Sequence, residues 1–262
     1  MRATGMALRS GKPAVDSSVP VTTQINGTSL LDLAQQLFGE TPVLWGRYFT
    51  STATTGSVEY RHLKENQPLR DRGVRVLPIA RQTKYVNGSQ TRGSADAEAN
   101  ADDLIATFGA DYLASQGGKF LLVLDVEGSP ALSANYYFGW ATTLMAHSRT
   151  STGGKVTILP CVYGIHSDGS TWNSLNEAHA RGAECHGAWI ARWRVRGCSA
   201  LLPFDPSVVS PPVQLPCKIL LWQYADDCHG GGGFDCDQTN PDIDLEQDLL
   251  SKCILPPPSL MA

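Results

Sequence analysis

The segment from residue 119 to residue 130 constrains the fold of this chain more than any other. Phe120 to Leu124 is an unbroken apolar run, the pattern of a strand that is buried on both faces in a parallel sheet. The run ends at Asp125 and Glu127, which are predicted to share one face because side chains alternate along a strand. Parallel α/β folds place their chemistry at such strand ends, although two acids there can also simply begin a polar loop.

Seven further segments have the pattern of strands, and they alternate with helical segments in the first two thirds of the chain. The other strands are predicted at residues 13–18, 42–49, 74–80, 155–164, 186–194, 218–225 and 241–246. Helices are predicted at residues 29–38, in part of 58–72, and at 94–115, 133–147 and 172–181. Residues 197–216 are rich in Pro and Ser and show no helical period. Eight strands in 262 residues predict a single irregular α/β domain, a (β/α)8 TIM-like barrel with helices reduced after the fifth strand.

The barrel is expected to span residues 13–255, between a flexible N-terminal lead-in (1–12) and a C-terminal tail (256–262). A net charge of −4 argues against a nucleic-acid partner, and no apolar segment approaches the roughly 20 residues needed to span a membrane. Residues 1–12 lack the apolar core of a signal peptide, so export would need another route. The chain is expected to be a monomer.

The seven cysteines all lie in the second half of the chain, from Cys161 onward. They show no C-x2-C spacing and the histidines are scattered, so we predict no metal site. Cys228 and Cys236 bracket a Gly-rich loop, and their spacing allows a disulfide if the protein works outside the cytoplasm. An odd total leaves at least one free thiol in a monomer.

Acidic and aromatic residues collect at the predicted strand ends, which a barrel brings into one bowl. The acids are Asp16, Asp125, Glu127, Asp242 and Asp244. The aromatic residues are Tyr48, Tyr163, Trp189, Trp193, Trp222 and Tyr224. A bowl of acids walled by aromatic rings fits a sugar chain, whose C–H faces pack on the rings while its hydroxyls bond the carboxylates. Structural roles stay open for some of them: Trp189 or Trp193 as barrel filling, Tyr48 as packing, and Asp16 as a turn cap.

The order of these motifs resembles glycoside hydrolase family 25, the lysozyme-type N-acetylmuramidases, and the related glycoside-hydrolase-like barrels. The matching residues are Asp16, Leu124-Asp-Val-Glu127, Trp189-Ile-Ala-Arg-Trp193, Trp222-Gln-Tyr224 and Ile243-Asp-Leu245, with Leu77-Pro-Ile79 and Gly93–Ala99 resembling the middle region. The resemblance covers residues 13–250. Chitinase-type barrels fit poorly, because their pattern requires acids where Phe120 and Val123 stand.

The resemblance implies an enzyme without a cofactor that cleaves the glycan strand of peptidoglycan, outside the cell or at the cell wall. It implies Glu127 as general acid, Asp125 as its partner, and Asp16 and Asp244 as further carboxylates. The aromatic residues at the strand ends would bind the sugar. Two departures are the Ala14-Val-Asp-Ser-Ser18 opening in place of Gly-x-Asp-x-Ser, and Asp-Leu-Glu246 in place of Asp-Leu-Asn. The alternative is a non-catalytic glycan-binding or structural barrel of a phage or secretion-system particle.

Overall fold

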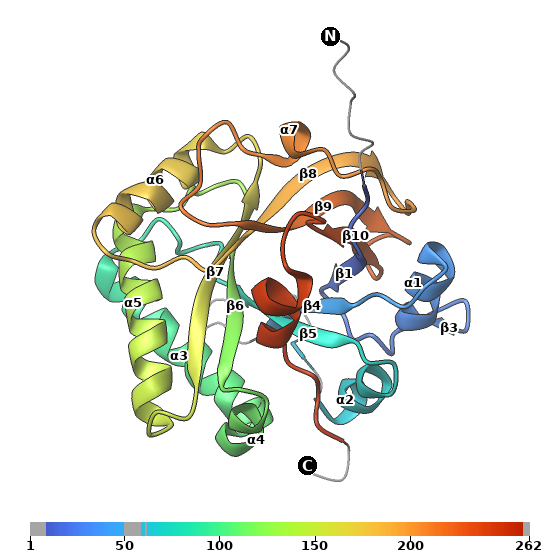
Figure 1. Cartoon of the computed structure of the whole chain (residues 1–262), viewed down its shortest axis with the longest axis horizontal. Coiled ribbons are helices and arrows are strands. Elements are labelled where there is room, and N and C mark those ends of the chain that lie inside the picture. Colours follow the sequence, from blue (N-terminus) through green and yellow to red (C-terminus); the bar gives the residue numbers. More distant parts are fainter. Residues whose placement is uncertain (1–8, 50–58, 61, 259–262) are drawn as a thin grey trace.

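A closed barrel of eight strands forms the centre of the molecule (Figure 1). The computed structural model describes residues 9–49, 59–60 and 62–258. Around the barrel the strands are β1 (Pro13–Ser17), β10 (Phe234–Thr239), β9 (Ile219–Cys228), β8 (Ala188–Arg196), β7 (Thr157–Ile165), β6 (Lys119–Val126), β5 (Arg75–Arg81) and β4 (Leu44–Phe49). A separate two-stranded sheet pairs β2 (Gln24–Ile25) with β3 (Thr28–Ser29). The predicted irregular (β/α)8 barrel is confirmed.

Helices cover the barrel on two sides, with α3, α5 and α6 grouped on one side and α1 and α2 on the other (Figure 1). They are α1 (Leu30–Phe38), α2 (His62–Asp71), α3 (Gln90–Phe108), α4 (Ala110–Ser115), α5 (Ala134–Ser151) and α6 (Gly169–Ala180). Helix α1 begins at Ser29, whose side chain accepts from the Asp32 N–H, and ends at Gly39 with φ of 71°. The predicted helix 94–115 is divided into α3 and α4 at Gly109, which has φ of 80°.

Helices α3 and α5 approach closely because glycine stands at their contact. A Cβ atom on Gly93 would lie 2.1 Å from the carbonyl oxygen of Tyr136, and one on Gly139 would lie 2.1 Å from that of Gln90. Any larger residue would push the helices apart. The Ala-rich α3 therefore lies flat against α5, and both cover the outer face of the barrel.

The connections become irregular in the last third of the chain. After β8, the described chain forms a single four-residue helix, α7 (Pro206–Val209), before β9. The chain then ends in two short helical turns, η1 (Leu245–Leu249) and η2 (Leu250–Lys252). Of the helices in the described ranges, none is long and apolar enough to cross a membrane.

The eighth strand is not where the sequence predicts it. Residues 241–246 were expected to form it, but β10 occupies Phe234–Thr239 and pairs antiparallel with both β1 and β9. The glycines at 230–233 form a tight hairpin, so the chain turns back immediately after β9. Residues 241–246 follow β10 at the end of the barrel where the parallel strands begin, because β10 runs in the opposite direction to every other barrel strand.

Alternation along the strands creates two apolar layers. On β6, Leu121 and Val123 face the barrel interior, whereas Phe120, Leu122 and Leu124 face the helices. Leu249 of η1 and Cys253, which follows η2, pack into the interior layer, and these helical turns lie across the barrel in Figure 1. They close the end where the parallel strands begin, so the opposite end, where those strands finish, is the mouth.

An ion pair with no solvent exposure lies between the outer face of β4 and α2. Arg47 Nε contacts Glu65 Oε2 at 2.8 Å, and both side chains are 0 % exposed. Arg47 also donates to the carbonyl oxygen of Ser17 at 2.9 Å, and Glu65 accepts from the Val21 N–H at 3.0 Å. The pair therefore ties α2 to the chain that leaves β1.

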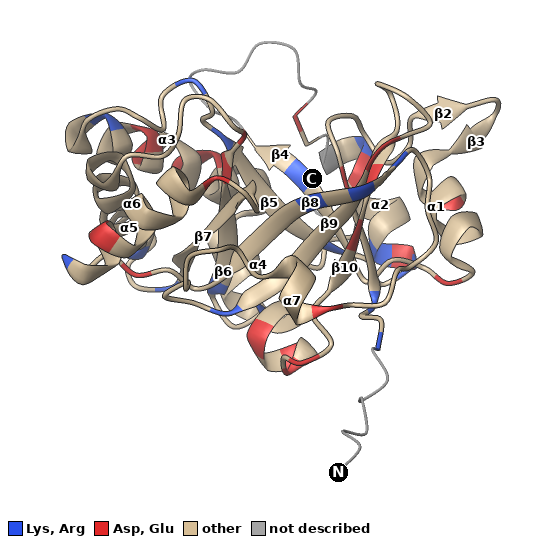
Figure 2. Ribbon diagram, turned by 90° about the horizontal axis from the view of Figure 1, so that it is seen from above, with Lys and Arg blue, Asp and Glu red and all other residues tan. Residues whose placement is uncertain are grey.

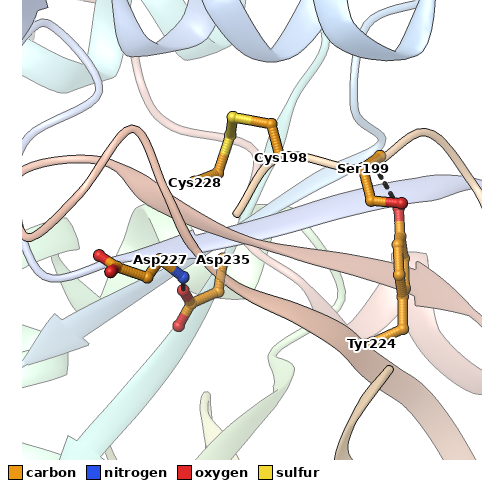
Figure 3. Close-up of a disulfide and its surroundings, with 6 residues drawn as sticks. All are labelled: Cys198, Ser199, Tyr224, Asp227, Cys228 and Asp235. Atoms are coloured by element: carbon orange, nitrogen blue, oxygen red, sulfur yellow. Dashed lines mark hydrogen bonds between the residues drawn. A yellow bond between two sulfur atoms is a disulfide. The ribbon is translucent and has the colours of Figure 1, made fainter. Parts of the chain in front are cut away.

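A disulfide joins Cys198, which follows β8, to Cys228, the last residue of β9 (Figure 3). Their Cα atoms are 4.3 Å apart. Because Arg196 lies opposite Asp226 in the parallel register, Cys198 and Cys228 meet two residues further on. The Cys228–Cys236 disulfide that the spacing allows does not form, since Cys228 pairs with Cys198, and Cys236 lies opposite Ala225 in the hairpin as a buried free thiol.

Candidate active site

Three predicted carboxylates converge at the mouth of the barrel. Asp16 comes from β1 and Asp125 from β6, both from inward-facing positions, and Glu127 follows β6 and is exposed. They lie close enough for their charges to interact with one another. Gly46 on β4 leaves room for this arrangement, because a Cβ there would lie 2.7 Å from that of Asp16.

The antiparallel strand β10 adds two acids that the sequence analysis missed. Asp235 lies opposite Asp16 in the register of β1 and β10, and Asp237 lies one inward-facing position further along the strand. Asp237 accepts a hydrogen bond from the Trp189 Nε1–H at 2.9 Å. The detectable signal was the alternation of Phe234-Asp-Cys-Asp, which has the period of a strand with one acidic face.

Gln223 on β9 connects this group of acids to the aromatic residues. Its Oε1 accepts from the Tyr163 hydroxyl at 2.8 Å and from the Trp193 Nε1–H at 2.7 Å. Its Nε2 donates to Asp16 at 2.7 Å and to Asp235 at 3.3 Å. The amide orientation is fixed chemically, because an indole N–H can only donate and must therefore meet the amide oxygen.

Burial shifts the acid–base behaviour of the carboxyls around Gln223. The pKa of Asp16 is raised to about 6 by burial, against hydrogen bonds with Asp237 and Gln223 that lower it. The pKa of Asp235 is raised to about 8 by burial and by the charge of Asp16. Burial and Asp16 also raise the pKa of Asp237 well above its usual range. The interaction between Asp16 and Asp237 therefore favours the protonated form of Asp237, because two neighbouring carboxylates repel each other.

Asp125 lies beneath Glu127 and is almost completely buried. Burial raises its pKa well above the usual range, the charge of Glu127 adds to the effect, and the positive charge of Arg81 opposes it. Its Oδ1 has no hydrogen-bond partner among the described residues, and Thr83 approaches Oδ2 at 3.5 Å. Arg81 ends β5, lies 5.3 Å from the centre of the Tyr48 ring, and was not identified from the sequence.

Four of the predicted aromatic residues face the interior or the mouth. Trp189 is 2 % exposed and packs edge-on against Tyr163, with ring centroids 5.4 Å apart, so it fills the barrel below the site. Trp193 is 46 % exposed. Together with Tyr48 it lines a cavity of about 280 Å³ that also contains Asp16 and Asp235.

Trp222 and Tyr224 do not reach the mouth, which corrects their assignment to sugar subsites. Because Gln223 faces inward, its two neighbours must face outward, and both pack in the layer between barrel and surface. Trp222 donates its Nε1–H to the carbonyl oxygen of Arg192 at 3.0 Å. The Tyr224 hydroxyl donates to the carbonyl oxygen of Ser199 at 3.2 Å (Figure 3).

Asp244 lies at the opposite end of the barrel from Glu127, which corrects its assignment as a site carboxylate. It follows β10 and caps η1, where its side chain accepts from the Gln247 N–H at 3.0 Å. The neighbouring Asp242 is also at that end, where it pairs with Arg9 at 2.7 Å. Reversal of β10 is the cause, because residues that follow it emerge at the closed end.

The described residues contain one group of three metal-ligand atoms, Cys198, Cys228 and His229, within 4.8 Å of one another. Both sulfur atoms of this group are joined in the disulfide and cannot bind a metal as thiolates. Over the described ribbon, acidic and basic residues are interspersed among the elements (Figure 2).

No protein-family model and no curated protein matches this chain. Solved structures match its fold. An uncharacterized B. stearothermophilus protein aligns with a TM-score of 0.65 at 22% identity, covering 93% of this chain and 100% of that one. The catalytic domain of endolysin Ply40, from bacteriophage P40 of Listeria monocytogenes, aligns at 0.50 and 16% identity, covering 95% and 100%. The Clostridium perfringens spore cortex lytic enzyme SleM aligns at 0.52 and 16% identity, covering 90% and 68%.

Proposed function

We propose that this protein is a glycoside hydrolase that cleaves the glycan strand of peptidoglycan, with Glu127 as general acid and Asp125 as its partner. The observation that carries the proposal is the placement of an exposed Glu127 directly beyond a buried Asp125 at the barrel mouth, within electrostatic reach of Asp16.

Glycoside cleavage needs a proton donor at the leaving oxygen and a carboxylate near the developing positive charge. Glu127 is reachable from solvent, so its carboxyl can meet a glycosidic oxygen in the mouth. Asp125 and Asp16 lie within electrostatic reach of it. Burial raises the pKa of Asp125, and the positive charge of Arg81 only partly opposes this rise. The proposed role of Asp125 requires its ionised form, because that form stabilises a positively charged sugar.

The aromatic residues support a sugar as the occupant of the mouth. Trp193 presents nearly half of its surface, while its indole N–H is held by Gln223. A ring fixed at one edge and open on its face is suited to pack against the C–H groups of a pyranose. Peptidoglycan is proposed among polysaccharides because an endolysin and a spore cortex lytic enzyme share the fold.

The test is incubation of the whole chain with purified peptidoglycan, followed by measurement of new reducing ends and mass spectrometry of the released fragments. A muramidase leaves N-acetylmuramic acid at the new reducing end. Fragments that end in N-acetylglucosamine would keep the hydrolase and overturn the bond assigned. Binding to the glycan with no new reducing ends would overturn the enzyme and favour a glycan-binding barrel.

A further inference from the structure

Two thiols at the closed end of the barrel are in direct contact, far from the mouth. Cys185 lies between α6 and β8, and Cys217 lies just before β9. Their sulfur atoms are 3.2 Å apart, and the Cys185 thiol is hydrogen-bonded to Cys217. Neither belongs to the disulfide between Cys198 and Cys228.

The backbone holds these two cysteines together. Strands β8 and β9 are parallel neighbours, and Ala188 lies opposite Ile219 in their register. The Ala188 N–H donates to the carbonyl oxygen of Lys218 at 2.9 Å, so the segments that enter the two strands run side by side. Bond formation between the two sulfurs therefore requires a shift of about 1 Å, because a disulfide bond is about 2.05 Å long.

The pair is also suited to thiol–disulfide exchange, and it can be reached from the surface. Hydrogen bonding with Cys217 lowers the pKa of Cys185, and the shared proton raises that of Cys217. A thiolate is the nucleophile in thiol–disulfide exchange. Both residues are partly exposed, and Cys217 lines a surface groove of about 460 Å³, through which a small disulfide can reach its sulfur.

We propose that Cys185 and Cys217 form a second disulfide by exchange with a low-molecular-weight disulfide such as oxidised glutathione. One thiol attacks the small disulfide and releases one glutathione thiol, and the other thiol then displaces the second. One Sγ–Sγ bond forms and one S–S bond breaks. The two cysteines lose two electrons and two protons, which the two glutathione thiols carry away.

This bond would act on the crossover from β8 to β9, which has only a four-residue helix in the described chain. Residues 197–218 join β8 to β9 and contain the short α7. The disulfide between Cys198 and Cys228 ties the start of this segment to the end of β9. A bond between Cys185 and Cys217 would tie its other end to the entrance of β8, so covalent links would replace the packing that a long helix provides elsewhere.

The experiment is equilibration of the whole chain in an oxidised glutathione buffer, followed by alkylation and peptide mapping without reduction. We expect a peptide pair that contains Cys185 and Cys217, and a melting temperature higher than that of protein with both thiols free. Closing a loop with a sequence separation of 32 residues should raise it by about 6–12 °C. Cys185→Ser and Cys217→Ser should each abolish the bridge and the rise, whereas Cys161→Ala, which removes a buried neighbouring thiol, should retain both.

The proposal is overturned if both thiols remain alkylated under conditions that keep the bridge between Cys198 and Cys228. It is also overturned if either sulfur pairs with Cys161, or if Cys217 remains bound to glutathione with Cys185 free.

Discussion

Trp193 donates its indole N–H to Gln223 at 2.7 Å, and the same amide donates to the buried Asp16 at 2.7 Å. One side chain thus links the exposed ring at the mouth to the acids within the barrel. If a glycan packs on Trp193, its position relative to these acids depends on Gln223.

Replacing Gln223 with Leu keeps a side chain of similar size but removes its four hydrogen bonds, to Tyr163, Trp193, Asp16 and Asp235. We expect glycan affinity and cleavage to fall by about tenfold or more, and the free energy of unfolding to fall by about 1–3 kcal/mol, because buried polar partners lose their hydrogen bonds. Isothermal titration calorimetry, reducing-end release and urea unfolding measure these effects. The control is Gln36→Leu on α1, outside the barrel. Unchanged affinity and cleavage in Gln223→Leu would remove the linking role.

Glu127→Gln keeps the side-chain size but removes the transferable proton. We expect cleavage to fall by about 10²–10⁴-fold, with little change in folding because Glu127 is exposed. The matched control is Asp244→Asn at the closed end, where an Asn side chain still caps η1, and full activity is expected. Equal activities of the two variants in a reducing-end assay would refute the assignment of the acid.

Trp193→Ala and Trp222→Ala separate binding from folding. The first removes an exposed ring at the mouth and should weaken glycan binding by about 0.5–1.5 kcal/mol or more while the protein stays folded. The second removes a buried ring from the outer layer and should lower the free energy of unfolding by about 3–5 kcal/mol. Glycan titrations and urea unfolding of both variants measure the difference. Loss of binding in a fully folded Trp222→Ala alone would reverse their roles.

Raised carboxyl pKa values predict a loss of stability with rising pH. Between pH 3.8, the ordinary value, and about 8, the folded state keeps a proton on Asp235 that the unfolded state releases. Asp16 behaves likewise between 3.8 and about 6. The free energy of unfolding should therefore fall as pH rises through this window. Asp235→Asn should flatten the decline between about pH 6 and 8 in urea unfolding, and an unchanged slope would contradict it.

Glu65→Ala leaves the fully buried Arg47 without its carboxylate. We expect a loss of about 3–5 kcal/mol of stability, the usual consequence of breaking a buried pair. In urea unfolding, Asp111→Ala, which breaks an exposed pair with Lys155, should change little. Similar small losses in both variants would show that Arg47 is satisfied by its other contacts.

The sequence identifies well those parts of the fold in which the chemical pattern is local. The apolar run before Asp125 predicts a strand, because a strand buried on both faces needs apolar residues at every position. Ser29 and Gly39 mark the ends of α1, because they are typical helix-capping residues. Asp235 and the linking role of Gln223 were not predicted, because both arise from pairing between distant strands. The short β10 has the sequence pattern of a polar loop, because its inward face carries acids. Its antiparallel direction cannot be recognised from the sequence.

The reversal of β10 also has a practical consequence for protein engineering. The hairpin that precedes it contributes Gly230 and Gly231 to the cavity wall at the mouth. A Cβ on Gly233 would lie 1.7 Å from the carbonyl oxygen of Cys228, whereas Gly231 and Gly232 face open space. Peptides inserted between Gly231 and Gly232 would extend that wall toward a bound polymer while the strand ladder beneath keeps its register, which makes this hairpin the natural position for loop grafting.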